Sequence, residues 1–389
     1  MYDFDVIIDR SNTDSYKLEL RQQTFGNPNV IPLWVADMDF AVAPPIAKVL
    51  QERARHDIYG YTVRSAAFNQ SIVNWQKNQF QWQIEPEWIV YSPGVVPAMA
   101  FSILSMTQPG DGIIIQPPVY PPFFSVVKSN QRNLLLNPLV KNQNGDYVFN
   151  LQEFEQYAAL PSTKIFLLCH PHNPVGRDWT VQELTEIGNI CLKHGVTVLS
   201  DEIHADLVLS GKKHTPFAAV NDDFAMNSIT FMAPSKTFNI AGLNTAYVIS
   251  KNKELLSKYH TFQNNLQLNL GHVFSAIILQ TAYNHCGPWL KELLFYLSDN
   301  INFVNDFLKN NIPMVKMKKP DATFLLWLDF SALKLSQDEL RTLLYQKAGV
   351  GLNDGMSFGQ EGNGYMRINV ACPQSVLQDA LVKIQRALV

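Results

Sequence analysis

The sequence predicts an α/β fold with a large, mostly parallel sheet and a second, smaller α+β domain. The clearest observation is a strand, a helix and a strand at KIFLLC (164–169), 180–194 and VTVLSD (196–201). Both strand segments are continuous apolar runs, which is typical of a sheet that is covered on both faces. The helix begins with a capping-box pattern, Thr180 followed by Glu183. A unit of this kind joins parallel strands, so the sheet is expected to be largely parallel.

The same alternation extends to both sides of this unit. A helix over 97–106 follows the loop SPGVV, and strands are expected at GIIIQ (112–116) and SITFMA (228–233). The last third of the chain changes character and combines long helical patterns with two strands. Its expected elements are a helix near 288–311, a strand at 323–330, a helix near 336–348, a strand at 365–371 and a final helix that ends at Val389.

These patterns divide the chain into three parts. A large domain is expected over residues 46–287 and a small C-terminal domain over residues 288–389. Residues 1–45 are rich in Pro and Asp and lack a strong period, so we expect an N-terminal arm that associates with the small domain. With 389 residues, of which 47% are hydrophobic, the chain can bury a core of this size.

The charge balance argues against several classes of partner. The chain has 31 Lys+Arg against 34 Asp+Glu and no run of like charges, so we expect no binding to nucleic acid or to an anionic membrane surface. The start of the chain lacks a basic segment followed by an apolar one. The longest nearly apolar run, near 95–106, is shorter than the roughly 18 residues that cross a bilayer. We therefore expect a cytoplasmic protein.

The cysteines and histidines predict neither a disulfide framework nor a metal site. Four cysteines lie far apart without CxxC spacing, which indicates reduced core residues. They are Cys169, Cys191, Cys286 and Cys372. The pair His170 and His172 has the spacing of metal ligands, but it adjoins an Asn-Pro turn, and we expect no acidic ligand of suitable spacing beside it.

Polar and aromatic residues follow four of the predicted strands. In a parallel sheet the carboxyl ends of the strands lie at one edge, and ligands bind beyond them. The loops PPVYPPF, HPHNPVG, DEIHADL and PSKTFN each follow such a strand. The candidate residues in these loops are Tyr120, Asn173, Asp201, His204, Ser235 and Lys236. We therefore expect these side chains to gather at one edge of the sheet.

Each candidate also has an ordinary structural explanation. Asn173 can initiate a turn, Asp201 can cap a helix, and Tyr120 can pack against prolines. His204 can be a hydrogen-bonded core histidine, and Lys236 can extend its amine to water. The placement of all of them at one sheet edge favours a shared ligand.

Pyridoxal 5′-phosphate requires the kinds of side chain that gather at this edge. The cofactor needs an amine for its aldehyde, a carboxylate for its ring nitrogen, a donor to its phenolate oxygen and an aromatic face. These groups are supplied, in that order, by Lys236, Asp201, Asn173 and Tyr120. The phosphate needs further donors, which the backbone N–H groups of Val95 and Val96 offer at the start of a helix. The hydroxyl of Ser235 adds one more.

Arg367 lies in the strand YMRINVA, where the alternation places it in mostly apolar surroundings. A buried guanidinium without an anion is costly, so Arg367 needs an anionic partner. Two partners are open at this point. One is a carboxylate of the protein itself, in a structural salt bridge. The other is the carboxylate of an amino-acid substrate, which the planar guanidinium can bind with two hydrogen bonds.

Six motifs occur in an order and at separations that resemble a known family. They are SPGVVPA, PPVYPPF, HPHNPVG, SDEIHADL, PSKTFNIAG and MRINVACP. Together they resemble the fold-type I pyridoxal-phosphate enzymes of the aminotransferase class I/II superfamily. Nearer the start, WVADMDFAVAPP and YGYT resemble the cystathionine β-lyase-like branch, the bacterial C–S lyases. The resemblance spans nearly the whole chain and implies the PLP-dependent transferase fold of the aspartate aminotransferase type.

The resemblance implies a role for each residue of the sheet edge. Lys236 is similar to the Schiff-base lysine of the family, Asp201 to the partner of the pyridine nitrogen, and Tyr120 to the aromatic residue that stacks on the ring. Asn173 and His204 are similar to the residues beside the phenolate oxygen. This chain departs from many relatives at His204, where they have tyrosine.

The resemblance also implies a substrate clamp and a homodimer. Arg367 matches the residue that binds the substrate α-carboxylate, and Asn173 is expected beside it. Tyr61, in YGYT, matches a tyrosine that reaches the cofactor phosphate from the neighbouring subunit, which implies active sites at a dimer interface. Many aminotransferases carry an arginine on the phosphate eight residues after the lysine, where this chain has Asn244. Phosphate binding then depends more on Ser235, the helix N-terminus and Tyr61.

The resulting hypothesis is α,β-elimination of cystathionine, cysteine or another S-substituted cysteine. Lys236 takes the Cα proton, a thiolate leaves from Cβ, and pyruvate and ammonia follow. The alternative is an aminotransferase that acts on an L-amino acid and a 2-oxo acid, because the two reactions share their first steps. A further alternative is a chain that keeps the fold and chiefly binds a regulator, but the full set of site residues argues against it.

Overall fold

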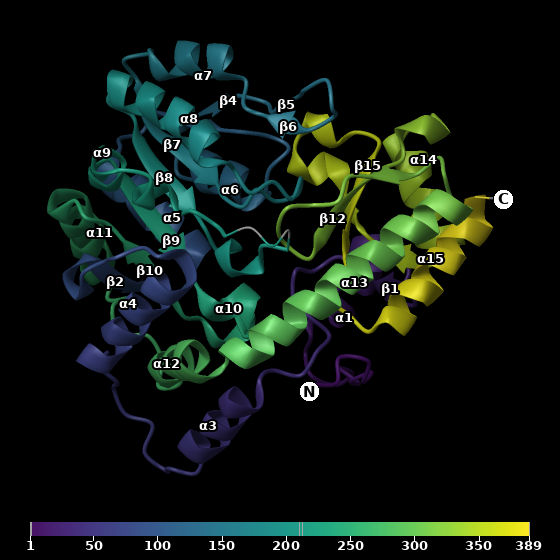
Figure 1. Cartoon of the computed structure of the whole chain (residues 1–389), viewed down its shortest axis with the longest axis horizontal. Coiled ribbons are helices and arrows are strands. Elements are labelled where there is room, and N and C mark those ends of the chain that lie inside the picture. Colours follow the sequence, from purple (N-terminus) through teal and green to yellow (C-terminus); the bar gives the residue numbers. More distant parts are fainter. Residues whose placement is uncertain (1, 210, 212, 389) are drawn as a thin grey trace.

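A seven-stranded sheet forms the larger part of the molecule (Figure 1). The computed structural model describes residues 2–209, 211 and 213–388. The strands run in the order β2-β10-β9-β8-β7-β3-β4, and neighbours are parallel except in the two pairs that β10 makes. Their bounds are β2 Ile89–Ser92, β3 Gly112–Ile115, β4 Asn133–Leu136, β7 Thr163–Cys169, β8 Thr197–Asp201, β9 Ser228–Met232 and β10 Ala246–Ile249. The predicted mostly parallel sheet is confirmed.

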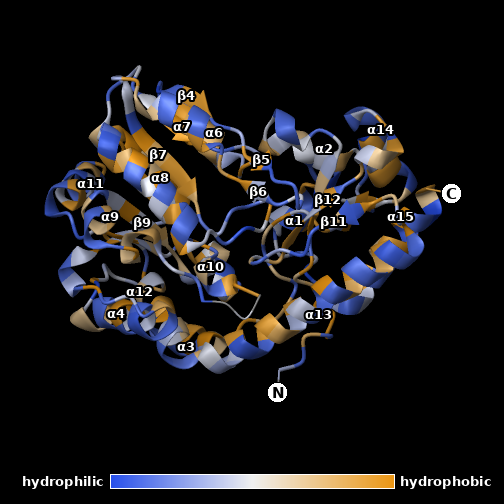
Figure 2. Cartoon of the chain, turned by 45° about the horizontal axis from the view of Figure 1, so that its top comes forward, coloured by the Kyte–Doolittle hydropathy of each residue, from blue (hydrophilic) through white to orange (hydrophobic). Residues whose placement is uncertain are grey.

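Helices cover both faces of this sheet. Ile113 and Ile115 of β3 pack in a core with α5, α6 and α11, whereas Ile114 packs in a core with α7, α8 and α9. The apolar strands therefore lie between helices whose outer faces are polar (Figure 2). The bounds of the helices are α5 Val95–Met106, α6 Pro122–Lys128, α7 Leu151–Ala158, α8 Val181–His194, α9 Asp222–Met226 and α11 Lys253–Asn265.

A second sheet of four antiparallel strands lies beside the first, in the order β11-β12-β15-β14. Its strands are β11 Lys316–Met317, β12 Leu325–Asp329, β14 Asn353–Asp354 and β15 Tyr365–Asn369. The long helix α13 (Gly287–Asn311) runs from the large sheet toward this smaller one (Figure 1). Its buried side chains, such as Leu293, Leu297 and Ile301, recur every three or four residues and form one apolar face.

The N-terminal segment packs on the smaller sheet region. Its strand β1 (Ile31–Pro32) pairs in parallel with β13 (Val350–Gly351), and β5 (Val140–Lys141) pairs with β6 (Tyr147–Val148) in a separate hairpin. The remaining helices are α1 Tyr16–Glu19, α2 Arg21–Phe25, α3 Pro44–Ala54, α4 Ala66–Phe80, α10 Pro234–Thr237, α12 Ser275–His285, α14 Gln337–Arg341 and α15 Gln374–Leu388. A π-helical segment, Thr342–Lys347, continues α14. The domain limits expected at residues 45/46 and 287/288 stay a prediction.

The local predictions are confirmed where the sequence pattern is strong. The capping box of α8 is present with Thr180 and Glu183, and the helix ends at the left-handed Gly195. Helix α5 begins at Val95 instead of Pro97, because Gly94 provides the N-cap and proline is tolerated in the first turn of a helix. The short strands β2, β4 and β10 were not predicted. Strand β3 has the same length, but its run of three isoleucines gave it a clear apolar signal. The predicted end of the last helix, Val389, lies outside the described residues.

Two expectations from composition can be compared with the structure. Within the described chain, no helix combines the length and the apolar character needed to cross a membrane. All four cysteines are buried free thiols, as predicted.

Candidate active site

A cavity of about 200 Å³ lies at the carboxyl ends of β7 and β8, beside the turn that follows β9. Eight of the ten predicted site residues line it. They are Val95, Val96, Tyr120, Asn173, Asp201, His204, Ser235 and Lys236. Further lining residues that were not predicted include Ala36, Cys169 and Ile203. The prediction that these loops meet at one sheet edge is therefore confirmed, whereas the role of each residue stays a proposal.

Lys236 reaches this cavity from the short turn that follows β9. Strand β9 ends at Met232, helix α10 begins two residues later at Pro234, and Lys236 lies in that single helical turn. Its Nζ donates a hydrogen bond to the carbonyl of Ala36 at 2.6 Å. Burial lowers the pKa of Lys236 to about 8, with a further contribution from the positive charge of Arg367. At pH 7 about a tenth of the amine is therefore neutral, far more than for an ordinary lysine.

Asp201 is the last residue of β8 and lies within the protein interior. Its Oδ1 accepts a hydrogen bond from the backbone N–H of Ile203 at 3.2 Å. Burial raises the pKa of Asp201 to about 7, and the charge of Lys236 acts in the opposite direction. A cationic ring nitrogen placed against this carboxylate would stabilise its charged form.

Asn173 and Arg367 are joined by a direct hydrogen bond. Nη1 of Arg367 donates to Oδ1 of Asn173 at 3.0 Å, and Nη2 donates to the carbonyl of Trp34 at 2.9 Å and to Oδ1 of Asn353 at 2.5 Å. Nε of Arg367 is buried without a partner, and burial lowers the pKa of Arg367 to about 10. Within the described chain, all of its hydrogen-bond partners are neutral, so the structural salt bridge considered from the sequence is not formed.

His204 and Tyr120 form two further walls of the cavity. Nδ1 of His204 is buried and has no partner among the described residues. Burial lowers the pKa of His204 to about 3, and the charges of Lys236 and Arg367 add to this effect, so the ring is neutral at pH 7. Burial also raises the pKa of Tyr120, which keeps its hydroxyl protonated. A neutral imidazole and a phenol can each donate a hydrogen bond to a bound anion.

The N-terminus of α5 faces the same cavity. Gly94 is the N-cap residue and carries no capping side chain, while Val95 and Val96 are the first two helical residues. The N–H groups of the first turn have no acceptor within a helix and attract anions. Ser235 lines the cavity with them.

A segment from the N-terminal arm crosses the site and was not predicted to do so. Residues 34–40, here called the strap, supply the carbonyls of Trp34 and Ala36 that bind Arg367 and Lys236. Asn369 holds the strap through the carbonyls of Val35 and Asp37, each at 2.6 Å. These contacts use backbone atoms and join residues about 200 or more positions apart, so no local sequence signal could reveal them.

Four charged side chains anchor the strap to the arm. Arg10 binds Asp37 and Asp39, each at 2.6 Å, and the buried amine of Lys17 binds Asp39 at 2.7 Å and Asp37 at 3.4 Å. Burial tends to raise the pKa of Asp37, but the hydrogen bond with Arg10 and the charge of Lys17 outweigh it and leave that pKa below its usual range. Asp37 therefore stays ionised, and its charge favours the protonated form of Lys236.

Two of the predicted site residues do not line the cavity: Arg367 contacts it through Asn173, whereas Tyr61 lies apart from it. Its side chain is 98% exposed on the described chain. Ile58, Tyr59 and Val63 of the same loop are also exposed. The structure therefore does not bring Tyr61 to the site of its own chain, and its reach into a neighbouring subunit stays a proposal.

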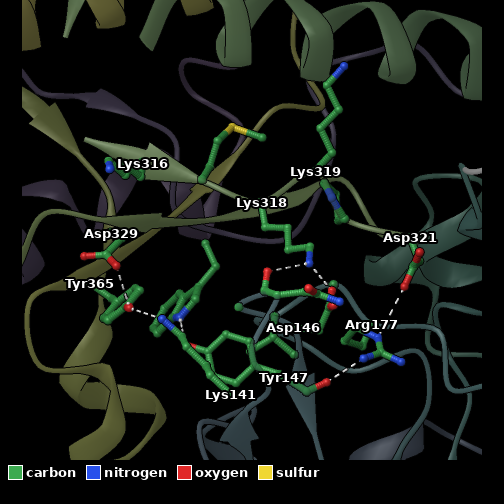
Figure 3. Close-up of a pocket in the computed structure, with 17 residues that line it drawn as sticks. Lys141, Asp146, Tyr147, Arg177, Lys316, Lys318, Lys319, Asp321, Asp329 and Tyr365 are labelled. Atoms are coloured by element: carbon green, nitrogen blue, oxygen red, sulfur yellow. Dashed lines mark hydrogen bonds and ion pairs between the residues drawn. The ribbon is translucent and has the colours of Figure 1, made fainter. Parts of the chain in front are cut away.

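A second cavity, of about 490 Å³, lies where the hairpin of β5 and β6 meets the smaller sheet (Figure 3). Nζ of Lys141 donates to the hydroxyl of Tyr365 at 2.6 Å, and that hydroxyl donates to Asp329 at 2.7 Å. Lys318 and Asp146 form an ion pair across the same boundary. These contacts join the smaller sheet, which carries Arg367, to the hairpin of β5 and β6.

The expectation that no acidic residue lies near the His170 and His172 pair is wrong for His170. Oδ1 of Asp178 lies 3.5 Å from Nδ1 of His170, and His214 lies beside both. The loop between them folds back, since the backbone of His172 pairs with that of Arg177. An eight-residue spacing through such a loop has no simple sequence signature.

Comparison with known proteins places the chain in a family. A family model described as aminotransferase class I and II matches residues 28–384. The chain belongs to this family. It is 44% identical over 388 residues to cystathionine beta-lyase PatB from Bacillus subtilis (strain 168), with 99% of each chain covered.

Solved structures with the same fold align with the full length of this chain. A PLP-bound structure from Clostridium difficile 630 that carries an aminotransferase name has a TM-score of 0.98 and 45% identity, with 100% of each chain covered. The PLP-bound C-S lyase from Staphylococcus hominis has a TM-score of 0.93 and 32% identity, with 100% of this chain and 98% of that chain covered. The predicted family, fold and cofactor class are confirmed. The names of the Bacillus subtilis and Staphylococcus hominis relatives agree with the predicted PLP-dependent lyase.

The donor set of the cavity fits pyridoxal phosphate. It contains a poorly solvated amine, a buried carboxylate, an amide, an aromatic ring and a helix N-terminus. The unpartnered Nδ1 of His204 and Nε of Arg367 show that polar groups around the cavity are left for a ligand. The group would be held by Lys236, Asp201 and Asn173 at its ring and by the α5 N-terminus at its phosphate.

The lowered pKa of Lys236 gives a direct prediction. In cofactor-free protein, acylation of Lys236 by acetic anhydride should rise with a midpoint near pH 8, because burial disfavours the ammonium form; the ordinary lysine value is 10.5. Peptide mass mapping across a pH series measures this midpoint, with the exposed Lys48 as the internal reference. A midpoint for Lys236 near 10.5 would contradict the environment described above.

Proposed function

We propose that this chain is a pyridoxal-phosphate-dependent C–S β-lyase that cleaves cystathionine, cysteine or another S-substituted cysteine to a thiol, pyruvate and ammonia. Two observations carry the proposal. The partly buried amine of Lys236 lines the cavity, and the buried guanidinium of Arg367, which has no anionic partner among the described residues, is joined to the same cavity by Asn173. The amine of Lys236 suits a cofactor aldehyde, and the guanidinium of Arg367 suits a substrate carboxylate. The lyase names of relatives over the whole chain length support the reaction type.

Each cavity residue has a role toward the cofactor in this proposal. When the cofactor is bound, Asp201 would hold its ring nitrogen, Asn173 and His204 would hold its phenolate oxygen, and Tyr120 would cover its ring face. Oδ1 of Asn173 accepts from Arg367, which leaves the Nδ2 amide free to donate to the phenolate. The phosphate would be held by donors from three parts of the chain. They are the N–H groups of Val95 and Val96, the hydroxyl of Ser235 and the hydroxyl of Tyr61 from a second copy of the chain.

Proton removal from the substrate depends on Lys236 and Asp201. When bound, pyridoxal phosphate supplies an electron-withdrawing ring that stabilises the negative charge left at Cα. Nζ of Lys236 removes the Cα proton, a task suited to a base whose pKa is about 8. Asp201 keeps the proton on the ring nitrogen, because its carboxylate is buried and gains stability from a cationic partner.

Arg367 orients the substrate for this step. Its Nε is buried and lacks an acceptor, so a carboxylate can add a hydrogen bond without displacing the three that the guanidinium already makes. The strap holds Arg367 and Lys236 through neighbouring carbonyls and so fixes the substrate carboxylate relative to the base.

Elimination follows because sulfur is a good leaving group. The Cβ–S bond breaks with both electrons on sulfur, and a thiolate, whose conjugate acid has a pKa of about 8.5, leaves without a strong acid. The released enamine then reacts with water to give pyruvate and ammonia. The reaction is a β-elimination followed by hydrolysis, and it needs no 2-oxo acid as a second substrate.

The proposal includes a homodimer whose partner completes each site. Support comes from the loop of Tyr61, where Ile58, Tyr59 and Val63 expose apolar side chains beside it. An aminotransferase that acts on an L-amino acid and a 2-oxo acid is the second candidate function. It is favoured by the family description and by the name of the Clostridium difficile structure.

The lyase proposal predicts thiol and pyruvate from cystathionine alone. The holoenzyme should release both products in equal amounts without any 2-oxo acid, and Lys236→Ala should abolish their release together with the visible absorption of the bound cofactor. Coupled assays for pyruvate and free thiol measure the reaction. Strict dependence on an added 2-oxo acid would select the aminotransferase instead.

The substrate clamp predicts a separate effect of Arg367→Lys. Loss of the charged hydrogen bond from Nε should lower kcat/KM for cystathionine about 100-fold, mainly through KM, while the cofactor absorption stays. Arg341→Lys is the matched control, since Arg341 pairs with Asp354 and Asp338 away from the cavity. Unchanged KM in Arg367→Lys would remove this residue from substrate binding.

A further inference from the structure

Four titratable side chains lie directly behind the cavity and take no part in the chemistry above. They are His170, Asp178, Glu202 and His214. His170 follows β7, Glu202 follows β8, and His214 belongs to the segment between Leu207 and Phe217. The rings of the two histidines and the carboxylate of Glu202 are fully buried. A group of this kind in an interior needs a structural or functional reason.

His214 is held by a carboxylate at each end of its ring. Its Nδ1 lies 2.7 Å from Oδ1 of Asp178, and its Nε2 lies 3.0 Å from Oε2 of Glu202. Only the imidazolium form donates from both nitrogens. Burial alone would lower the pKa of His214, but the two hydrogen bonds outweigh it and raise that pKa to about 9. The ring is therefore a buried cation at neutral pH.

His170 stays neutral beside it. Its Nε2 lies 3.0 Å from the carbonyl of Thr215, and its Nδ1 accepts the backbone N–H of Trp179 at 3.4 Å. Burial lowers the pKa of His170 to about 4, and the charge of His214 adds to this effect. Because protein hydrogen bonds occupy the ring nitrogens of both histidines, a metal ion would have to break them.

Glu202 connects this cation to Asp201, its chain neighbour. Oε1 of Glu202 accepts from the hydroxyl of Ser200 at 2.7 Å and from the backbone N–H of Phe217 at 3.0 Å. Its own backbone N–H binds the carbonyl of Phe231 in β9 at 2.9 Å. Glu202 thus fixes the chain on either side of Asp201, and its charge disfavours the ionised form of Asp201.

We propose that His214 is a positioning residue for Asp201. As an imidazolium between Asp178 and Glu202, it holds the turn of residues 201–204 in place. It also offsets the negative charge of Glu202, which would otherwise favour the protonated, uncharged form of Asp201. The inference rests on the proposed role of Asp201 toward the cofactor ring. His214 reaches the cofactor only through Glu202 and Asp201, so it is not itself a catalytic residue.

The other groups that face His214 fit this role. Asp206 lies near enough for the charge of His214 to oppose the effect of burial, which raises the pKa of Asp206 to about 6. Asp206 is bound by Trp75 and Thr237, next to Lys236. The Phe80 ring makes a T-shaped contact with His214, with the ring centroids 5.6 Å apart, and helps to exclude water. His214 is thus a cation placed among Asp178, Glu202 and Asp206.

The charge of His214 can be measured in the unmodified holoenzyme. Side-chain ¹⁵N NMR of histidine-labelled protein should show an imidazolium signal at pH 8 that is missing in His214→Gln. His194→Gln is the matched control, because His194 also faces a carboxylate, Glu155, at the other end of α8. A neutral ring for His214 at pH 8, or a stoichiometric metal ion in the purified protein, would overturn the inference.

The coupling to Asp201 requires a double-mutant cycle on cofactor affinity. His214→Gln should weaken pyridoxal-phosphate binding about tenfold in the natural chain, which corresponds to a shift of one pKa unit, but less than twofold when Asp201 is already Asn. Equal weakening in both backgrounds would show a merely structural role and overturn the inference. If Asp201→Asn alone leaves the affinity for pyridoxal phosphate unchanged, the proposed role of Asp201 is wrong, and the inference about His214 is wrong with it.

The pH dependence of folding stability is a second test of the charge of His214. The folded pKa of His214, about 9, lies above the ordinary value of 6.5, so its stabilising effect is full below pH 6.5 and is lost as the pH rises through 9. The difference in Tm between the natural protein and His214→Gln should therefore shrink from pH 6 to pH 10. A difference that stays constant over this range would contradict a charged His214.

Discussion

The rest of the site depends on one constraint: the amine of Lys236, just after β9, is held away from bulk water. A lysine ammonium in such a place loses hydration, and the pKa of Lys236 falls to about 8. The protein compensates with the Ala36 carbonyl and with the charges of Asp37 and Asp201. Without these groups the amine would be driven further toward its neutral form, and without burial it would be an ordinary surface cation. The site thus needs apolar surroundings together with a few charged groups at defined positions, such as Asp37 and Asp201.

This balance requires parts of the chain that are far apart. Lys236 and Asp201 come from the large sheet, Arg367 comes from the smaller sheet, and the strap comes from the N-terminal arm. Arg367 contacts all three, since it binds Asn173 and Trp34 from its place in β15. The polar contacts between β5, β6 and the smaller sheet hold these parts in register (Figure 3). The site therefore forms only when both sheets and the arm are folded together.

The sequence predicted the parts of this arrangement that depend on local pattern. Continuous apolar strands and a capping box located β7, α8 and β8, and the rule for strand ends then brought Tyr120, Asn173, Asp201 and Lys236 to one edge. It could not predict that the strap crosses the site, because the strap binds Lys236 and Arg367 through backbone carbonyls, which any residue can supply. It also missed the pairing of His214 with Asp178 and Glu202, because these residues meet only through the folding of two loops. Tyr61 cannot be placed from one chain, since its expected partner is a second copy.

The most direct test of the central claim is to reduce the yellow holoenzyme with borohydride and map the attached group. Reduction fixes pyridoxal phosphate to the amine that holds it, and digestion followed by mass spectrometry locates the modified lysine. The account predicts the phosphopyridoxyl group on Lys236, in the peptide that contains PSKTFNIAG. A group on another of the lysines, or no stable attachment at all, would contradict it.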